Sequence, residues 1–218
     1  IAEQVALALA GDFVPFAVNI DAAELAGTMV PYLPLAEKLG ALLSSMGRAA
    51  VGDKVEVSFE GEIGGYDNRL VSLAAAKGLM SQLVDEPVSF VNASGLLAEA
   101  GITLSVVSST ASLDYRNRLT VRGEQRSLTG TLIGLRDVAR IIQIDDHVLD
   151  VPPSAHLLIM RNDDRPGVIG SVGTILGGAG INIDNMDVGR TTSGTSAMMV
   201  IDTGQPVPDP VVEDLRRA

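Results

Sequence analysis

Two short segments, Met160–Gly167 and Gly178–Ile183, constrain the fold of this chain more than any other feature. The first reads as a strand that ends in polar residues and turns through Arg165-Pro166-Gly167 into an apolar helix. The pattern places Pro166 in the first turn of that helix, where its missing N–H costs nothing. Glycines able to adopt left-handed geometry end the helix, and a second strand is predicted to begin at Ile181. A strand, a helix and a second strand are therefore expected to be joined by polar turns.

The remainder of the C-terminal part extends this pattern to the order strand, helix, strand, strand, helix. The predicted strands cover residues 156–160, 181–188 and 196–202, and the predicted helices cover 166–176 and 208–218. One more strand would complete a ferredoxin-like βαββαβ sandwich. We therefore expect a ferredoxin-like unit that lacks its last strand.

The preceding residues mix helices and strands without a regular βαβ repeat. An apolar stripe predicts a helix over 35–46, and alternation of apolar and charged residues predicts a half-buried strand over 54–60. Further helices are expected over 68–84 and before Gly101, and further strands over 102–107, 118–122 and 127–133. A tight turn at Asp145-Asp146 predicts a hairpin at the end of this region. The whole chain is accordingly predicted to be of the α+β class.

Prolines mark the predicted domain boundary. Pro152 and Pro153 cannot extend a strand, so residues 151–154 are expected to be a linker between a mixed domain at 13–150 and the unit at 155–218. Residues 1–12 read as the helical tail of a preceding segment. Because both ends of the chain fall inside helical patterns, we expect a fragment of a longer protein.

Composition excludes several classes of function. The 27 acidic and 16 basic residues give a net charge of −11, which opposes binding to nucleic acid. The chain has no cysteine, so it has no disulfide, thiolate nucleophile or iron–sulfur ligand. It contains no run of about 20 apolar residues, and its opening segment has no basic n-region or cleavage pattern, so neither a membrane span nor a signal peptide is expected. A cytoplasmic protein that does not bind membranes is expected.

The polar turns suit a small amino acid. Asn162, Asp164 and Asn182 can accept hydrogen bonds from its ammonium group, and the backbone N–H groups at the start of the predicted helix can bind its carboxylate. No catalytic constellation accompanies them. Asp145, Asp146 and His147 have the side chains of a metal site, and a free-standing metal-dependent hydrolase is one alternative. A single tight cluster is more often a hairpin turn, so no metal site is predicted.

The motifs Asp164-Arg165-Pro166-Gly167 and Gly180-Ile181-Asn182-Ile183 resemble the signature of the ACT domain, a regulatory module of amino-acid metabolism. The segments 90–93, 128–132 and 142–144 make residues 13–150 similar to the allosteric-substrate-binding, or intervening, domain of bacterial D-3-phosphoglycerate dehydrogenases. A related alternative is the β-subunit of L-serine dehydratase, which pairs the same two domain types.

This resemblance implies a regulatory fragment that has no catalytic site and no cofactor of its own. The parent would be an NAD-dependent oxidoreductase of L-serine biosynthesis. L-Serine would bind between ACT domains that pair edge to edge in a homo-oligomer and would cause feedback inhibition. The effector-binding residues carried over are Asn162, Asp164, Arg165, Pro166, Gly167 and Asn182. In some relatives the intervening domain holds an anion or phosphorylated ligand, and Arg140, with Arg136 nearby, would be its candidates here.

Overall fold

The computed structural model describes residues 27–112, 114–162, 165–191 and 197–217. They form two compact units that divide between Ala139 and Arg140, and each unit is described by itself. The linker predicted at 151–154 lies after this division, and its first residue, Val151, is buried at the end of a strand. The predicted tail at 1–12 and the apolar segment at 13–20 lie outside the described residues.

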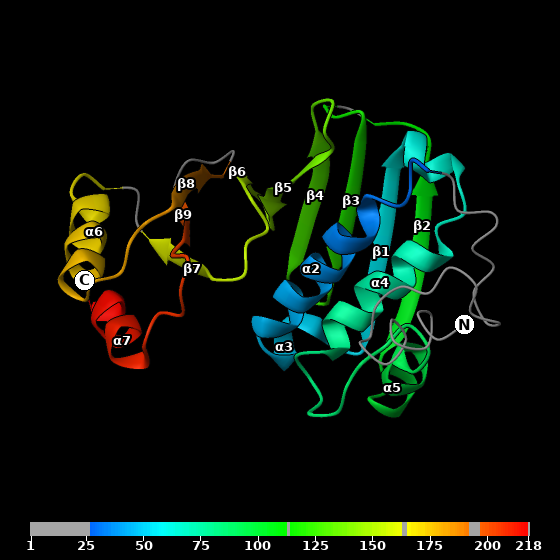
Figure 1. The fold of residues 1–218 in the computed structure, drawn as a ribbon, viewed down its shortest axis with the longest axis horizontal. Helices are drawn as coiled ribbons and strands as arrows, with labels where there is room; N and C mark the ends of the chain where they lie inside the picture. Colours follow the sequence, from blue (N-terminus) through cyan, green and yellow to red (C-terminus); the bar gives the residue numbers. More distant parts are fainter. Residues whose placement is uncertain (1–26, 113, 163–164, 192–196, 218) are drawn as a thin grey trace, which may run out of the picture. The chain divides into compact units, whose positions relative to one another are not determined.

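The first unit contains a four-stranded mixed sheet with helices on one face (Figure 1). Its strands follow the order β2-β1-β3-β4; β1 and β2 are parallel, whereas β3 is antiparallel to both β1 and β4. The strands are β1 (Lys54–Gly61), β2 (Thr103–Ser109), β3 (Asn117–Arg122) and β4 (Ser127–Ile133). The helices are α2 (Tyr32–Ser45), α3 (Arg48–Val51), the 3-10 helix η2 (Glu62–Gly65), α4 (Arg69–Met80) and α5 (Ala93–Glu99).

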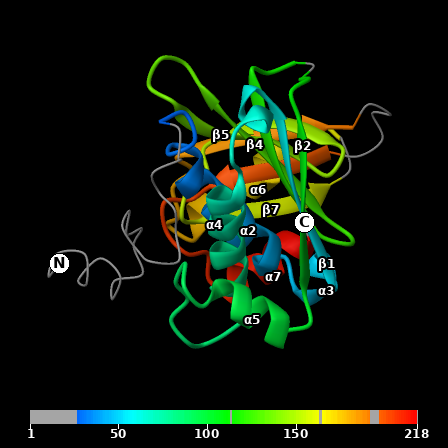
Figure 2. The ribbon, with the colours of Figure 1, turned by 90° about the vertical axis from the view of Figure 1, so that its right-hand side faces the viewer.

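Hydrophobic periodicity explains why these elements form. Val55, Val57 and Phe59 alternate with polar residues on β1 and are fully or almost fully buried. Leu39 and Leu43, on the apolar stripe of α2, are also fully buried. Figure 2 shows α2 and α4 on the same side of the sheet. These contacts confirm the predicted helix at 35–46 and the predicted strand at 54–60.

Helix α4 begins near the predicted position and ends earlier than predicted. The Asp67 carboxylate accepts a hydrogen bond from the Arg69 backbone N–H at 3.0 Å. Hydrogen bonds from the Arg69 side chain and backbone hold the pKa of Asp67 below its ordinary value. The helix ends at Met80 instead of Val84, because the Leu83 N–H already bonds to the Met80 carbonyl and starts a turn.

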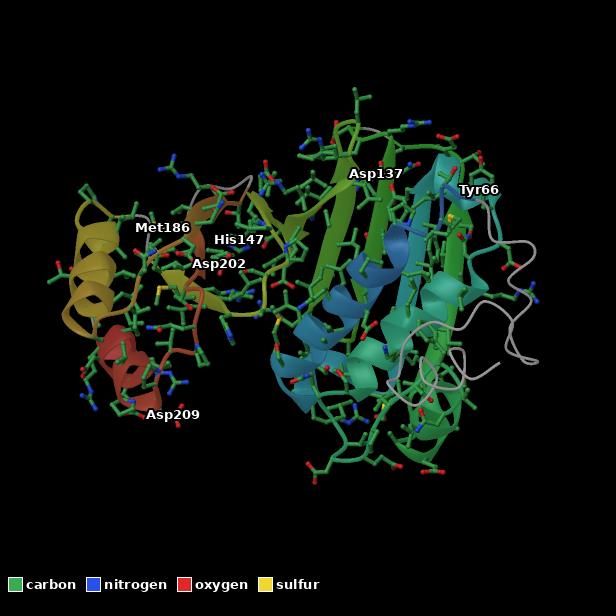
Figure 3. All side chains as sticks on the ribbon, in the orientation of Figure 1. Tyr66, Asp137, His147, Met186, Asp202 and Asp209 are labelled. Carbon is green, nitrogen blue, oxygen red and sulfur yellow. The ribbon has the colours of Figure 1, made fainter. Side chains whose placement is uncertain are left out.

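The second unit contains an antiparallel sheet with the order β5-β6-β8-β9-β7. Its elements are β5 (Val138–Ile144), which starts just before the division, β6 (His147–Val151), β7 (Leu157–Asn162), α6 (Val168–Gly178), β8 (Asn185–Arg190), β9 (Ala197–Asp202) and α7 (Asp209–Arg217). The sequence from β7 to α7 follows the predicted order, and the ferredoxin-like arrangement is confirmed. Figure 3 shows His147, on β6, beside the strands that carry Met186 and Asp202.

Two predicted boundaries in this unit are wrong. Helix α6 begins at Val168, because Gly167 precedes it with a φ of +97°, so Pro166 lies outside the helix. Strand β8 begins at Asn185 instead of Ile181. The Ile181 N–H bonds back to the Leu176 carbonyl and Gly180 has a φ of +71°, so the chain is still closing the end of α6 at this point.

A small apolar core holds this unit together. It contains Val172 and Leu176 of α6, Met199 and Ile201 of β9, Ile181 and Leu215. Ile181 is 4% exposed, so it anchors the turn that follows α6. The polar residue next to it, Asn182, is thereby held at the surface.

Candidate functional site

The end of β7 and the start of α6 border a cavity. Asn162 is the last residue of β7, where it pairs with Ala197 of β9, and Arg165 is exposed just before α6. Both residues line a cavity of about 630 Å³ beside α7. The other lining residues include Leu158, Met160, Arg161, Ser171, Leu215 and Arg216. The structure therefore brings two predicted site residues, Asn162 and Arg165, to one recess.

The α6 N-terminus adds backbone donors near this recess. Gly167 precedes the helix, and its carbonyl accepts the N–H of Ser171 at 2.9 Å. The first N–H groups of a helix have no acceptor within it, and its dipole makes this end partly positive. Together with the Arg165 guanidinium, these groups suit a carboxylate. Asp164, one of the three predicted acceptors for the ammonium group, lies outside the described residues.

Asn182 occupies a different place. It is exposed, and its Nδ2 donates a hydrogen bond to Asp184 Oδ1 at 2.6 Å. The Asp184 N–H in turn bonds to the Asp202 carbonyl at 2.8 Å, which fixes the turn against β9. Asn182 is not among the residues that line the cavity of Asn162 and Arg165.

Strand register shows how far apart the two asparagines are. Ala197 pairs with both Asn162 and Arg190, so Asn162 lies level with the Arg190 end of β8. Asn182 precedes Asn185, which begins the opposite end of β8. From Asn185 to Arg190 the strand advances by about 17 Å, at roughly 3.3 Å per residue. One copy of the chain therefore cannot place Asn162 and Asn182 on the same small amino acid.

The two arginines predicted to bind an anion fall in different units. Arg140 Nε lies 3.2 Å from Asp150 Oδ1, and the Arg140 side chain is 26% exposed. Arg136 is exposed in the turn before β5. An anion at Arg140 would have to compete with the Asp150 carboxylate.

The alternative metal site is not supported by the geometry of its residues. Asp145 Oδ2 forms an ion pair with Arg161 at 2.8 Å, and the nearly buried His147 places Nδ1 2.9 Å from Asp146 Oδ1. The described ranges contain no group of three or more histidine, aspartate or glutamate side chains that could hold a metal ion. Asp145 and Asp146 instead form the predicted hairpin turn between β5 and β6, and His147 is the first residue of β6.

Sequence reasoning missed the contribution of α7. Leu215 and Arg216 line the cavity, although their segment contains no motif that would mark a site. The available signal is the strong segregation of apolar and charged residues on α7, which buries Leu215 and leaves Arg216 at the surface.

Comparisons with known proteins agree with this architecture. The profile of the D-3-phosphoglycerate dehydrogenase intervening domain matches residues 28–145, and the ACT domain profile matches residues 156–218. The chain belongs to the D-3-phosphoglycerate dehydrogenase intervening-domain family and carries an ACT domain. Between the two matches lie residues 146–155, which include all of β6 in the ACT-containing unit.

Several curated relatives are named D-3-phosphoglycerate dehydrogenase. The protein from Mycobacterium leprae is 35% identical over 220 residues, which cover 97% of this chain and 41% of the relative. The proteins from Synechocystis and Methanocaldococcus jannaschii are each 32% identical and cover 100% and 99% of this chain. The chain thus spans about two fifths of the length of these relatives. Across the described residues, no helix is both long and apolar enough to cross a bilayer.

Proposed function

We propose that this chain is the regulatory region of a D-3-phosphoglycerate dehydrogenase and that its ACT domain binds L-serine as a feedback inhibitor. The parent would oxidise 3-phosphoglycerate with NAD, a reaction that other residues would carry out. The relatives reported above are named D-3-phosphoglycerate dehydrogenase, and they align with nearly the whole of this chain. This similarity favours the dehydrogenase over the L-serine dehydratase β-subunit as the parent protein. The metal-dependent hydrolase has no comparable support.

The observation that carries the proposal is the chemistry around Asn162 and Arg165. A free amino acid presents a carboxylate and an ammonium group on one carbon. Arg165 and the start of α6 supply positive groups for the carboxylate, and the Asn162 amide can accept a hydrogen bond from the ammonium. The serine side chain is small and polar, which suits a recess with polar groups such as Ser171.

The site is proposed to be shared between two copies of the chain. Asn162 and Asn182 lie at opposite ends of the ACT sheet within one copy. When a two-fold axis relates two copies in an antiparallel pair, the strands of one ACT sheet run in the opposite direction to those of the other. Asn182 of one copy then lies at the same end as Asn162 and Arg165 of the other. The serine site would therefore be complete only in a dimer or larger oligomer.

Isothermal titration of the purified chain with L-serine tests this function. The unchanged chain should bind L-serine, and Asn182→Ala should bind at least about tenfold more weakly, because a hydrogen bond to a charged group contributes roughly 1.5–3 kcal/mol. Gln205→Ala removes another exposed amide of the ACT domain and serves as the matched control that retains binding. Absence of both heat and thermal stabilisation of the unchanged chain at millimolar L-serine would contradict the proposal.

Arg140 is proposed as a separate anion-binding residue of lower affinity. Its guanidinium is partly accessible, and its ion pair with Asp150 reduces the charge available to a phosphate. Arg136, which is exposed in the other unit, is the second proposed anion-binding residue.

A further inference from the structure

Asp184 holds the side-chain amide of Asn182 in one orientation. The Asn182 side chain is exposed, and its Nδ2 lies 2.6 Å from Asp184 Oδ1. An asparagine amide has one end that donates hydrogen bonds and one end that accepts them, whereas an ionised carboxylate only accepts. Reversal of the amide would set Asn182 Oδ1 against the carboxylate and would lose a charge-assisted hydrogen bond. The Asn182 Oδ1 atom is therefore kept on the side of the amide that faces away from Asp184.

The end of β9 holds Asp184 in turn. The Asp184 N–H bonds to the carbonyl of Asp202, the last residue of β9, at 2.8 Å. A Cβ atom at Gly204 would lie 2.3 Å from Asp184 Oδ2, so the carboxylate packs directly on this glycine. Gly204 has a φ of +61°, and its N–H bonds to Asp202 Oδ1 at 3.1 Å. The carboxylate that orients Asn182 thus lies against a turn that is itself hydrogen-bonded.

The fixed amide limits which group of a ligand can bind to Asn182. This step rests on the proposed function of the ACT domain as an L-serine site. Because Oδ1 only accepts hydrogen bonds, it suits an ammonium or hydroxyl group and opposes a carboxylate. The negative charge of Asp184 adds to the same preference. The carboxylate of the effector is left to Arg165 and the start of α6.

We propose that Asp184 is a positioning residue of the effector site, which acts by presenting the Asn182 carbonyl to a donor group of the effector. Asp184 follows the Gly180–Ile183 motif and is not part of it. Its main-chain bond to Asp202 does not involve its side chain, so Asp184→Ala retains the turn. Loss of the carboxylate lets the Asn182 amide reverse and present its NH₂ group to the donor. The affinity for L-serine should then fall about fivefold or more.

Nuclear magnetic resonance of the side-chain amide tests the positioning without any ligand. The Asn182 amide signal is assigned as the one that disappears in Asn182→Ala. In the unchanged chain, one of its two protons should be shifted downfield by the bond to Asp184, and Asp184→Ala should remove that shift. Asp209→Ala is the matched control, because it removes another exposed ACT carboxylate, and it should leave the signal unchanged (Figure 3). The same Asn182 signal in Asp184→Ala and in the unchanged chain would overturn the proposal.

Isothermal titration with L-serine tests the consequence for binding. Asp184→Ala should bind about fivefold or more weakly than the unchanged chain, and Asp209→Ala should bind within about twofold of it. Equal affinities of Asp184→Ala and the unchanged chain would overturn the positioning role. If the unchanged chain binds no L-serine although its amide signal responds to Asp184→Ala, the proposed function fails while the contact between Asp184 and Asn182 stands.

Discussion

The packing of α2 on α4 predicts the effect of Gly78→Ala on stability. Helix propensity favours the alanine, whereas steric exclusion by α2 disfavours it. Alanine in place of glycine in a helix interior ordinarily stabilises a protein by about 1 kcal/mol. A Cβ atom at Gly78, however, would lie 1.9 Å from the Glu37 carbonyl oxygen and 2.6 Å from its carbonyl carbon. Gly40 faces α4 in the same way, since its Cβ would lie 2.1 Å from the Ala75 carbonyl oxygen. The two helices therefore touch through their backbones.

The magnitude follows from how far the helices must separate. Ordinary contact of a Cβ atom begins near 3.4 Å, so the alanine Cβ at 1.9 Å requires a displacement of about 1.5 Å. A gap of 0.5–1 Å already removes roughly a quarter to a half of each dispersion contact across it. Overpacking of a core costs about 1–3 kcal/mol, and a rigid backbone obstacle favours the upper part of that range. After the propensity gain, Gly78→Ala should destabilise the unit by about 2 kcal/mol.

Urea unfolding followed by far-ultraviolet circular dichroism measures this change. Gly95→Ala is the matched control, since Gly95 lies in α5 of the same unit and its added Cβ would meet no atom within 4 Å. The control should be unchanged or more stable by up to about 1 kcal/mol. Equal or greater stability of Gly78→Ala relative to Gly95→Ala would refute the backbone contact.

Three further predictions concern ionisation, the anion and inhibition. Burial raises the pKa of Tyr32 above its ordinary value of 10.0. The contribution of the protonated tyrosine to the free energy of unfolding is therefore complete below pH 10.0 and is lost as pH rises through the raised pKa. Tyr32→Phe should abolish this loss, which urea unfolding at roughly pH 9–11 would measure. Asp150→Asn frees Arg140 from its ion pair and should tighten inorganic phosphate binding in titration calorimetry, whereas an unchanged affinity would remove Arg140 as an anion site. In the proposed full-length parent dehydrogenase, Asn182→Ala should abolish the proposed inhibition by L-serine without changing kcat, and retained inhibition would exclude Asn182 from the effector site.

The sequence predicted the helices and strands well where their residues show a clear hydrophobic periodicity. The stripe on α2 and the alternation on β1 reflect burial against one neighbouring layer, so the periodicity of the residues suffices. The start of α6 and of β8 depend instead on glycine conformation. Gly167 and Gly180 both have positive φ values, and the sequence alone did not show which glycine closes or opens a helix.

Long-range contacts account for what the sequence could not predict. The motifs correctly indicated that Asn162 and Arg165 lie near the start of a helix. They did not show that Asn182 lies at the opposite end of the sheet, because strand register depends on residues far apart in the chain. The sequence also did not predict that β6 pairs with β8, because this pairing requires the close approach of Val148 to Gly189, which is distant in the chain.

The shared serine site is tested most directly by mixing Asn162→Ala with Asn182→Ala. Each variant alone should bind L-serine poorly, because every site in its oligomer lacks one asparagine. In a mixed two-fold pair, one site carries both substitutions and the other carries neither. Equal mixing with subunit exchange should therefore restore full-affinity binding at about a quarter of the sites in isothermal titration. Absence of any restored sites after demonstrated exchange, or normal binding by either variant alone, would contradict a serine site shared between two copies.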